Sequence, residues 1–291
     1  MSGGNSGSGR KRSRRPQRER LYGQHVIRAA LETNKRRLDR LFMIEGGPAT
    51  AEQAILVEQA RGLGLAIEEV PRVGFRERIG IEEEVGLQGM ALEVGPLPVL
   101  SSVAALPGVS AGGQGAATRS EGPIVALDGV EDPRNLGAIV RVAEAAGASG
   151  LLVTDRRCAP LGAVASRASA GALERLPVAR IANLVRGLEA LKKLGFWVFG
   201  ADAAGDQDLF AMPDKLLSGP VVVVLGAEGR GLRPSTSEHV DHRVRIPMAG
   251  GVGSLNVSTA AAVMLFEWVR RRRTRSGRDR SNSTDPGPVR E

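Results

Sequence analysis

Hydrophobic and polar positions follow two periods along the first third of the chain. Apolar side chains recur at helical spacing in two stretches and form short, strand-like runs in three others. The helices are predicted over residues 25–32 and 54–64, and the strands over residues 38–46, 66–71 and 90–97. Thr50 and Gln53 predict a capping box before the second helix, because their side chains can satisfy each other's unpaired backbone donors. We therefore expect a small α/β domain over residues 21–98.

From Gly122 onward the pattern becomes a regular alternation of apolar strands and amphipathic helices. The predicted strands cover residues 123–130, 150–155, 177–182, 196–203, 220–228 and 242–248. The predicted helices cover residues 135–147, 162–176, 184–195 and 257–269. Such alternation is typical of an α/β fold with a mostly parallel sheet and helices on both faces. Ligands of these sheets bind beyond the carboxyl ends of the strands, so the loops at those ends are the candidate site.

Composition distinguishes the remaining segments. Residues 99–121 are rich in Gly, Ala, Ser and Pro and lack periodicity, which predicts a linker. The chain of 291 residues has a net charge of +8, and this charge is concentrated at the two ends. Residues 1–20 carry seven Lys or Arg against one Glu, and residues 270–291 carry eight Arg against three acidic residues. Residues 1–20 and 273–291 are predicted to be disordered basic tails, which either solubilise the chain or attract phosphates.

Several functional classes lack their signatures here. The sequence has no Gly-x-x-x-x-Gly-Lys-Ser/Thr loop, and no Gly-x-Gly-x-x-Gly follows the strand at 123–130. A P-loop nucleotide hydrolase, a dinucleotide site and the common methyltransferase fold are therefore disfavoured. The lone Cys158 excludes an internal disulfide, and His25, His239 and His242 resemble surface histidines more than a metal set. No apolar run is long enough to span a bilayer. We expect a cytoplasmic protein that binds neither metal nor membrane.

Two of the loops at predicted strand ends carry candidate polar groups. In the first, Asn135 is placed to cap the following helix, and Arg141 is placed to pair with Glu144 on its surface. Taken alone, both residues are best explained by these structural roles. In the second, Glu228 follows a strand that is predicted to be buried, among glycines that let backbone approach a ligand: Gly226, Gly229 and Gly231.

The third loop, "IPMAGGVGSLNVS", joins the last strand to the last helix. One of Ser254, Asn256 and Ser258 is predicted to cap that helix. A cap explains one of these residues but leaves the long run of glycines before it unexplained. The loop is therefore a second candidate for contact with a ligand.

Together the three loops resemble the signature motifs of the SpoU (TrmH-like) family of RNA ribose 2′-O-methyltransferases, which belongs to the SPOUT superfamily. The resemblance covers residues 122–272, and the motifs match in order and spacing. The matching positions are Asn135, Gly137 and Arg141 in the first motif, Gly226, Glu228 and Gly229 in the second, and residues 246–248 with 254–256 in the third.

The resemblance implies a SPOUT domain whose parallel sheet is tied in a deep trefoil knot and binds S-adenosyl-L-methionine. The implied cofactor-binding residues are Gly226, Ile246, Leu255, Met248, Gly229 and Ala201. The implied catalytic residues are Arg141, Asn135, Glu228, Ser254 and Asn256. Because arginine stays protonated, we expect the guanidinium of Arg141 to hold a phosphate and stabilise a developing alkoxide rather than to act as a base. A homodimer through the knotted domain is also implied.

The stretch "LYGQHVIRAALE" resembles the start of a small L30e-like α/β domain that binds RNA. That domain is found in the RlmB-type subgroup, which methylates a guanosine ribose in large-subunit ribosomal RNA. We therefore expect ribosomal RNA as the substrate of this chain. Three alternatives stay open: a transfer RNA substrate, a role in antibiotic resistance, and a non-catalytic RNA-binding protein that assists ribosome assembly.

Overall fold

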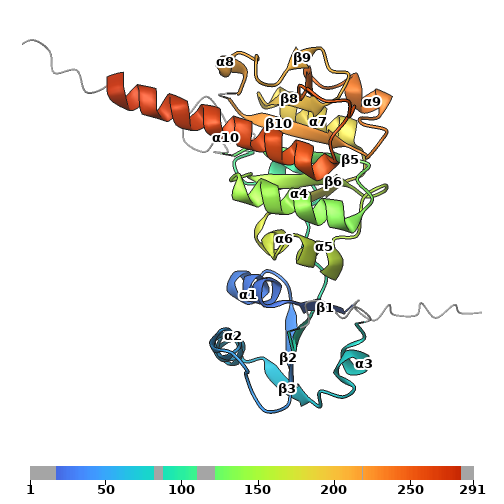
Figure 1. The fold of residues 1–291 in the computed structure, drawn as a ribbon, viewed down its shortest axis with the longest axis vertical. Coiled ribbons are helices and arrows are strands. Elements are labelled where there is room, and N and C mark those ends of the chain that lie inside the picture. The colour runs from blue at the N-terminus through green and yellow to red at the C-terminus, as the bar shows by residue number, and fades with distance from the viewer. Residues whose placement is uncertain (1–17, 82–87, 110–121, 218, 283–291) are drawn as a thin grey trace, which may run out of the picture.

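The structure is a computed structural model that describes residues 18–81, 88–109, 122–217 and 219–282. It contains two α/β units, which Figure 1 shows one above the other, with the N-terminal unit at the bottom. Among the described residues, no helix is long and apolar enough to cross a membrane.

The N-terminal unit is a four-stranded sheet in the order β1-β4-β2-β3. Its strands are β1 (Glu19–Tyr22), β2 (Leu38–Ile44), β3 (Ala66–Val70) and β4 (Met90–Val94). Its helices are α1 (Gln24–Thr33), α2 (Ala51–Gly62) and α3 (Phe75–Ile79). The β2–β3 pair is parallel, whereas β4 runs antiparallel to both of its neighbours. Helices α1 and α2 pack on one face of the sheet and the short α3 packs on the other (Figure 1).

The start of α2 matches the predicted cap except for one bond. The hydroxyl of Thr50 accepts the N–H of Gln53 at 3.2 Å. The side-chain oxygen of Gln53 accepts the N–H of Ala49 at 2.7 Å, one residue before the predicted partner. The amide of Gln53 also donates to the carbonyl of Gln88 at 2.7 Å. The glutamine therefore holds the helix start against the turn that precedes β4.

The C-terminal unit is a seven-stranded sheet in the order β7-β6-β5-β10-β8-β11-β9, in which all neighbouring strands are parallel. Its strands are β5 (Ile124–Asp128), β6 (Gly150–Thr154), β7 (Val178–Ile181), β8 (Trp197–Ala201), β9 (Gln207–Asp208), β10 (Val221–Gly226) and β11 (His242–Arg245). Its helices are α4 (Pro133–Ala145), α5 (Ala163–Ala168), α6 (Ala172–Arg175), α7 (Leu184–Lys193), α8 (Asp214–Leu217), α9 (Pro234–Ser237) and α10 (Val257–Asn282).

Two hydrophobic cores lie on opposite faces of this sheet. Helices α4, α5, α6 and α10 contribute to one core, and α7 contributes to the other. The central strands β5 and β10 are buried along their whole length, which explains their continuous apolar sequences. The parallel sheet with helices on both faces confirms the predicted α/β architecture.

The structure differs from the predicted linker over its first part. Leu100 forms a parallel bridge with Ala179 of β7 and so extends the edge of the larger sheet. A 3₁₀ turn, Val103–Ala105, follows and places Val103 in the core below α7. Buried side chains thus occur at irregular spacing, which a search for helix or strand periods does not detect. Residues 110–121 of the predicted linker lie outside the described residues.

Three predicted element boundaries are also wrong. The helix expected over 162–176 is split into α5 and α6, because Ala170 and Gly171 have φ angles of 51° and 85°. Glu19 and Arg20, placed in the N-terminal tail, belong to β1. Helix α10 continues to residue 282, well into the segment predicted to be a disordered tail. Residues 1–17 and 283–291 of the two tails lie outside the described residues.

A buried polar contact between the segment just before β2 and helix α6 joins the two units. The guanidinium of Arg36 donates to both carboxylate oxygens of Glu174, at 2.8 and 2.9 Å, and both side chains are almost fully buried. Ser166 donates to the same carboxylate at 2.7 Å. Beside it, a Cβ at Gly171 would lie 2.8 Å from the His25 carbonyl oxygen, so α6 and α1 approach each other closely. The N-terminal unit therefore packs against the segment formed by α5 and α6.

Candidate active-site cleft

Three polar side chains from distant parts of the chain meet where β10 ends. The side-chain amide of Asn256 donates to Asn135 Oδ1 at 3.2 Å and to the carboxylate of Glu228. Asn135 lies in the first turn of α4, Glu228 follows β10, and Asn256 precedes α10. The three loops singled out in the sequence are thus tied together by one asparagine.

Asn256 is also the cap of α10. Its Oδ1 accepts the backbone N–H of Ser258 at 2.8 Å and the hydroxyl of Ser258 at 2.6 Å. These bonds leave the amide nitrogen as the group that faces Asn135 and Glu228. A single side chain therefore fixes the start of the last helix with one atom and joins the other two loops with another.

The predicted cap at Asn135 is wrong. Asp132 is the N-cap of α4, since its carboxylate accepts the N–H of Arg134 at 2.8 Å, and Pro133 occupies the first helical position. Asn135 is consequently inside the first turn, where its side chain is available for Asn256. The choice between Asp132 and Asn135 depends on where the helix begins, which the pattern of apolar residues leaves uncertain by a few residues.

A cleft of ≈ 290 Å³ opens next to this contact, at the carboxyl ends of β8, β10 and β11. All six residues that the resemblance assigned to the cofactor line it: Ala201, Gly226, Gly229, Ile246, Met248 and Leu255. Glu228 and Ser254 line it as well. The cleft combines apolar side chains with glycine backbone and a few polar groups, the composition typical of a small-molecule site.

The floor of the cleft depends on a tight turn after β10. The backbones of Ala227 and Gly231 exchange two hydrogen bonds, at 2.9 and 3.1 Å, so the chain folds back on itself. A Cβ at Gly226 would lie 2.2 Å from the carbonyl carbon of Gly231, so only glycine fits there. Behind the turn, the buried carboxylate of Asp128 accepts three donors of Arg233, one of them the backbone N–H at 2.9 Å. Apolar periods do not predict this clamp, because Asp128 and Arg233 lie 105 positions apart in the chain.

Three glycines lie in the loop that forms the opposite side of the cleft, and one of them, Gly253, lines the cleft itself. Gly250, Gly251 and Gly253 have no positive φ angle, and a Cβ on any of them would meet no atom within 4 Å. Neither backbone conformation nor packing within the described chain therefore requires glycine at these positions. A molecule that approaches the backbone closely is a physical reason for them.

Arg141 stands apart from this cleft. It lies on α4, is exposed, and makes no hydrogen bond or ion pair with another residue of the described segments, including the expected partner Glu144. Gly137 of the same motif has a packing role, because a Cβ there would lie 2.4 Å from Ala168 Cβ in α5. The structure brings Asn135, Glu228 and Asn256 together but does not bring Arg141 to them within one chain.

The described histidines and acids include no group of three or more that could hold a metal ion. The description of His242 as a surface histidine is wrong. Its ring stacks on Phe199 at 5.2 Å and lies 5.5 Å from Trp197, and both ring nitrogens are buried without a hydrogen-bond partner. The neighbouring strand β8 supplies both aromatic rings, which a reading of local sequence does not reveal.

Comparisons with known proteins agree with this arrangement of loops. Residues 122–266 match the model of the SpoU rRNA Methylase family. The 23S rRNA (guanosine-2'-O-)-methyltransferase RlmB from Pseudomonas aeruginosa is 39% identical over 87% of this chain and 97% of its own length. The protein of the same name from Pseudomonas putida is 37% identical over 89% of this chain and 99% of its own.

Among solved structures, the AdoMet-bound rRNA methyltransferase from Sinorhizobium meliloti is similar, with a TM-score of 0.69 and 25% identity. The match covers 87% of each chain. It therefore extends across both α/β units and not only the sheet that carries the three motifs. The chain belongs to the SpoU rRNA methylase family.

Proposed function

We propose that this chain transfers a methyl group from S-adenosyl-L-methionine to the 2′-hydroxyl of a guanosine in large-subunit ribosomal RNA. The observation that carries the proposal is the cleft, which eight of the eleven residues assigned by the family motifs line. The Pseudomonas relatives, whose names state this reaction on 23S rRNA, match nearly their whole length to the chain. Their similarity favours ribosomal over transfer RNA.

The residues that line the cleft fit the cofactor in chemistry. Ile246, Leu255 and Ala201 offer apolar surface for the adenosine, and the backbone of Gly226 offers polar groups at the end of a buried strand. Gly253 on the opposite side of the cleft has open space beside its backbone, which leaves room for the rest of the molecule. When bound, S-adenosylmethionine supplies an activated methyl group on its sulfur. The protein's contribution is placement and electrostatics, and it uses no covalent nucleophile.

The polar residues at the rim of the cleft act on the RNA. Glu228 and Asn135, held by Asn256, present fixed oxygen atoms that we assign to positioning the ribose. Ser254 lies on the same wall and offers a hydroxyl. Arg141 binds the adjacent phosphate and stabilises the negative charge that develops on the 2′-oxygen.

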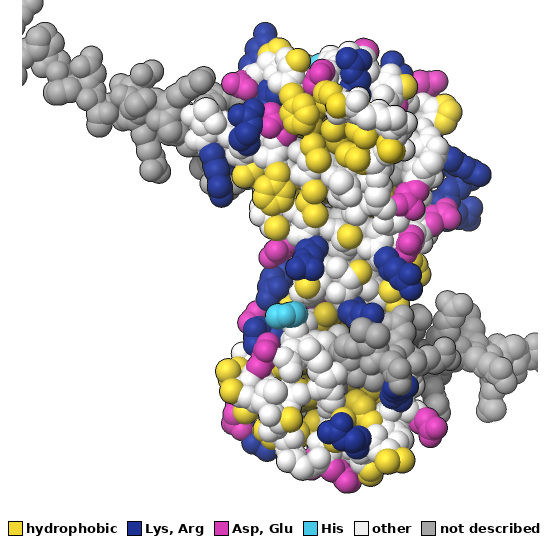
Figure 2. Space-filling model, viewed as in Figure 1, with side chains coloured by type: hydrophobic (Ala, Val, Ile, Leu, Met, Phe, Trp, Pro, Cys, Tyr) yellow, Lys and Arg dark blue, Asp and Glu magenta, His cyan; other side chains and the backbone are white. Residues whose placement is uncertain are grey.

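The position of Arg141 outside the cleft of its own chain supports a homodimer in which Arg141 of one protomer completes the cleft of the other. Figure 2 shows hydrophobic side chains gathered on the face of the larger unit that carries α4 and α10. Phe266 lies in the apolar part of α10, and 49% of it is exposed in the single chain. An apolar patch of this kind is typical of an interface between protein chains.

Two features of the fold are part of the same proposal. The segment 246–255 and the turn 226–231 line one cleft from both sides, which fits a chain threaded in a trefoil knot. The N-terminal unit fits an L30e-like RNA-binding domain, with helices on both faces of a four-stranded mixed sheet. The expected cytoplasmic location stays a prediction.

The product of the reaction tests the proposal. The purified chain is incubated with S-adenosylmethionine labelled in its methyl group and with large-subunit ribosomal RNA transcribed in vitro, and the nucleosides are analysed. We expect the label in 2′-O-methylguanosine. The variant Arg141→Ala should bind the cofactor and transfer no label, whereas Arg186→Ala, an exposed arginine on α7, should behave as the original chain. Label on a base, or none at all, contradicts the proposal.

A further inference from the structure

One half of a sheet face in the N-terminal unit is covered by charged side chains instead of a helix. Strand alternation places Tyr22, Phe42, Val70 and Ala91 on the α3 face, together with Phe75 and Ile79 of α3 itself. The same alternation places residues two positions earlier or later on that face, namely Arg20, Arg40, Glu68 and Glu93. Because α3 has only five residues, it covers the apolar half and leaves the charged half open.

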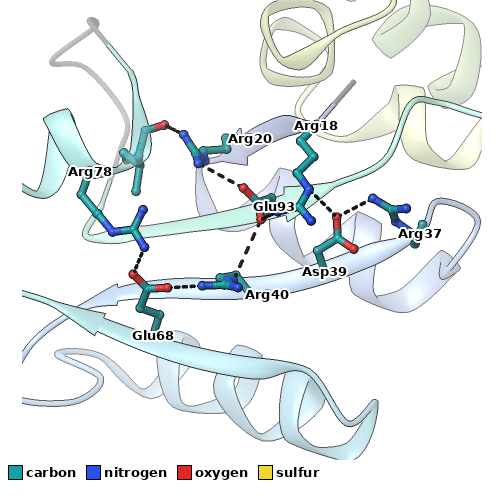
Figure 3. A network of polar contacts seen from close by, with 9 residues as sticks. Arg18, Arg20, Arg37, Asp39, Arg40, Glu68, Arg78 and Glu93 are labelled. Atoms are coloured by element: carbon teal, nitrogen blue, oxygen red, sulfur yellow. Dashed lines mark hydrogen bonds and ion pairs between the residues drawn. The ribbon is translucent and has the colours of Figure 1, made fainter. Parts of the chain in front are cut away.

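The charged half is an ordered network of arginines and carboxylates, which we call the arginine layer (Figure 3). Its members are Arg18, Arg20, Arg37, Asp39, Arg40, Glu68, Arg78 and Glu93. Glu93 accepts from Arg20 at 3.0 Å and from Arg18 at 3.2 Å. Glu68 accepts from both Arg40 and Arg78. Asp39, at a point where the register of β2 and β4 shifts, pairs with Arg37 at 2.9 Å and joins the network through Arg18 at 3.8 Å.

The network presents its positive groups outward. The five arginine side chains are 30–55% exposed, whereas the three carboxylates are 5–25% exposed. Arg20, Arg40 and Arg78 also stack around the buried ring of Phe42, at 5.4, 5.8 and 5.6 Å from its centroid. Five guanidinium groups over three carboxylates leave two positive charges uncompensated. The carboxylates and the ring hold the guanidiniums in place before any partner binds, which reduces the entropy lost on binding.

Because the arginines lie outward of the carboxylates, we propose that the arginine layer is the surface of the N-terminal unit that binds the phosphate backbone of the substrate RNA. Guanidinium forks match phosphate oxygens in geometry and charge, and phosphate contacts fix the position of a nucleic acid without reading its sequence. The partner is RNA because the proposal rests on the methyltransferase function assigned above. In the view of Figure 1, α3 and the start of α10 lie on the same side of the molecule, and Val257 and Ala260 at that start line the cleft. One RNA can therefore contact both.

The variants that test this surface avoid the arginines around Phe42, which also support packing. Arg18 and Arg37 are the most exposed members, at 55% and 52%, so the double variant Arg18→Gln/Arg37→Gln removes two positive charges with little effect on folding. Arg61→Gln is the matched control, because Arg61 lies on α2, over the other face of the sheet, and is 63% exposed. Equal thermal unfolding temperatures establish that all three chains fold.

Binding of each chain to transcribed 23S ribosomal RNA is measured between 50 and 200 mM salt, conditions over which phosphate contacts dominate affinity. For the double variant we expect about tenfold or more weaker binding at the lower salt, and a slope of log affinity against log salt smaller by roughly 1.5. Arg61→Gln should match the original chain. The variant Arg18→Lys/Arg37→Lys should retain most of the salt dependence.

Unchanged affinity and slope in the double variant overturn the inference, and so does an equal loss in Arg61→Gln. Weaker binding with an unchanged slope also overturns it, because the lost contact is then not to phosphate. Binding and methyl transfer are measured on the same samples. If the original chain binds RNA through this surface but transfers no methyl group, the proposed function fails and the docking surface stands.

Discussion

At the scale of single residues, Asn256 combines a structural role, as the cap of a helix, with contacts to two other polar residues of the candidate site. Its type and position before an apolar helix predict a cap, and the bonds to Ser258 confirm that role. The contacts of its amide to Asn135 and Glu228 were not predictable from spacing, because the three residues come from segments far apart in the chain. Only the family motif placed them in one site.

The substitution Asn256→Asp separates these two roles. Aspartate caps helices as well as asparagine does, so thermal stability should change little. The substitution removes the amide donor and puts a carboxylate beside Glu228, so methyl transfer should fall by about 10- to 100-fold, the cost of a lost hydrogen bond to a charged group. Rates are measured at saturating RNA and cofactor. Asn256→Ser, which keeps a cap and adds no charge, should be less impaired, and full activity in Asn256→Asp would show that the amide has no role.

At the scale of elements, hydrophobic periods predicted the long strands and helices and missed what depends on tertiary contacts. The continuous valines of β10 and the amphipathic pattern of α7 were sufficient for both. The break between α5 and α6 was missed because Ala170 adopts a left-handed conformation that its residue type does not favour. The two-residue β9 and the four-residue α8 and α9 are too short to show a period.

Helix α10 also contacts another segment of the chain, at its end away from the cleft. The guanidinium of Arg271 donates to the carbonyl oxygens of Leu209 and Phe210 at 2.9 and 3.0 Å. Glu267 accepts from Arg271 at 2.6 Å and from Arg270 at 2.7 Å. Hydrogen bonds from Arg270, and next from Arg271, lower the pKa of Glu267 from 4.5 to about 2. The helix thereby holds the chain segment that precedes α8.

This shift predicts a pH-dependent contribution to stability. Because the pKa of Glu267 is lower in the folded state, its stabilising effect is complete above about pH 4.5 and is lost as the pH falls towards 2. Glu267→Gln should therefore be less stable than the original chain at pH 7, and the difference should shrink between pH 4.5 and 2. Urea unfolding at several pH values measures this. Glu58→Gln, at an exposed position, should show no such trend; a gap that widens in acid would be inconsistent with the assignment.

At the scale of the whole molecule, the sequence pattern predicts two α/β units but does not indicate how they are joined. The fully buried pair among the contacts that join them, Arg36 and Glu174, is formed by residues 138 positions apart, in segments with no distinctive motif. Their buried pair adjoins α5, and α5 packs on α4, which carries Asn135 and Arg141. The N-terminal unit is thereby set at a defined orientation to the helix that bears these residues.

Removing one partner of this pair should be costly. Arg36→Met leaves the Glu174 carboxylate buried without its main partner and should destabilise the chain by about 3–5 kcal/mol. The double variant Arg36→Met/Glu174→Leu removes both charges and should recover most of the loss. Scanning calorimetry of the three chains measures this. An unfolding temperature for Arg36→Met equal to that of the original chain would mean that the pair does not hold the units together.

The most direct test of the central claim is the position of the methyl group in the RNA. Ribosomal RNA transcribed without modifications is treated with the chain and S-adenosylmethionine, hydrolysed in alkali and mapped at single-nucleotide resolution. A 2′-O-methyl group blocks cleavage at its own nucleotide, so the account predicts protection after one guanosine of the 23S RNA. It predicts none with Arg141→Ala. Uniform cleavage of RNA that has accepted label, or protection only in transfer RNA, would contradict it.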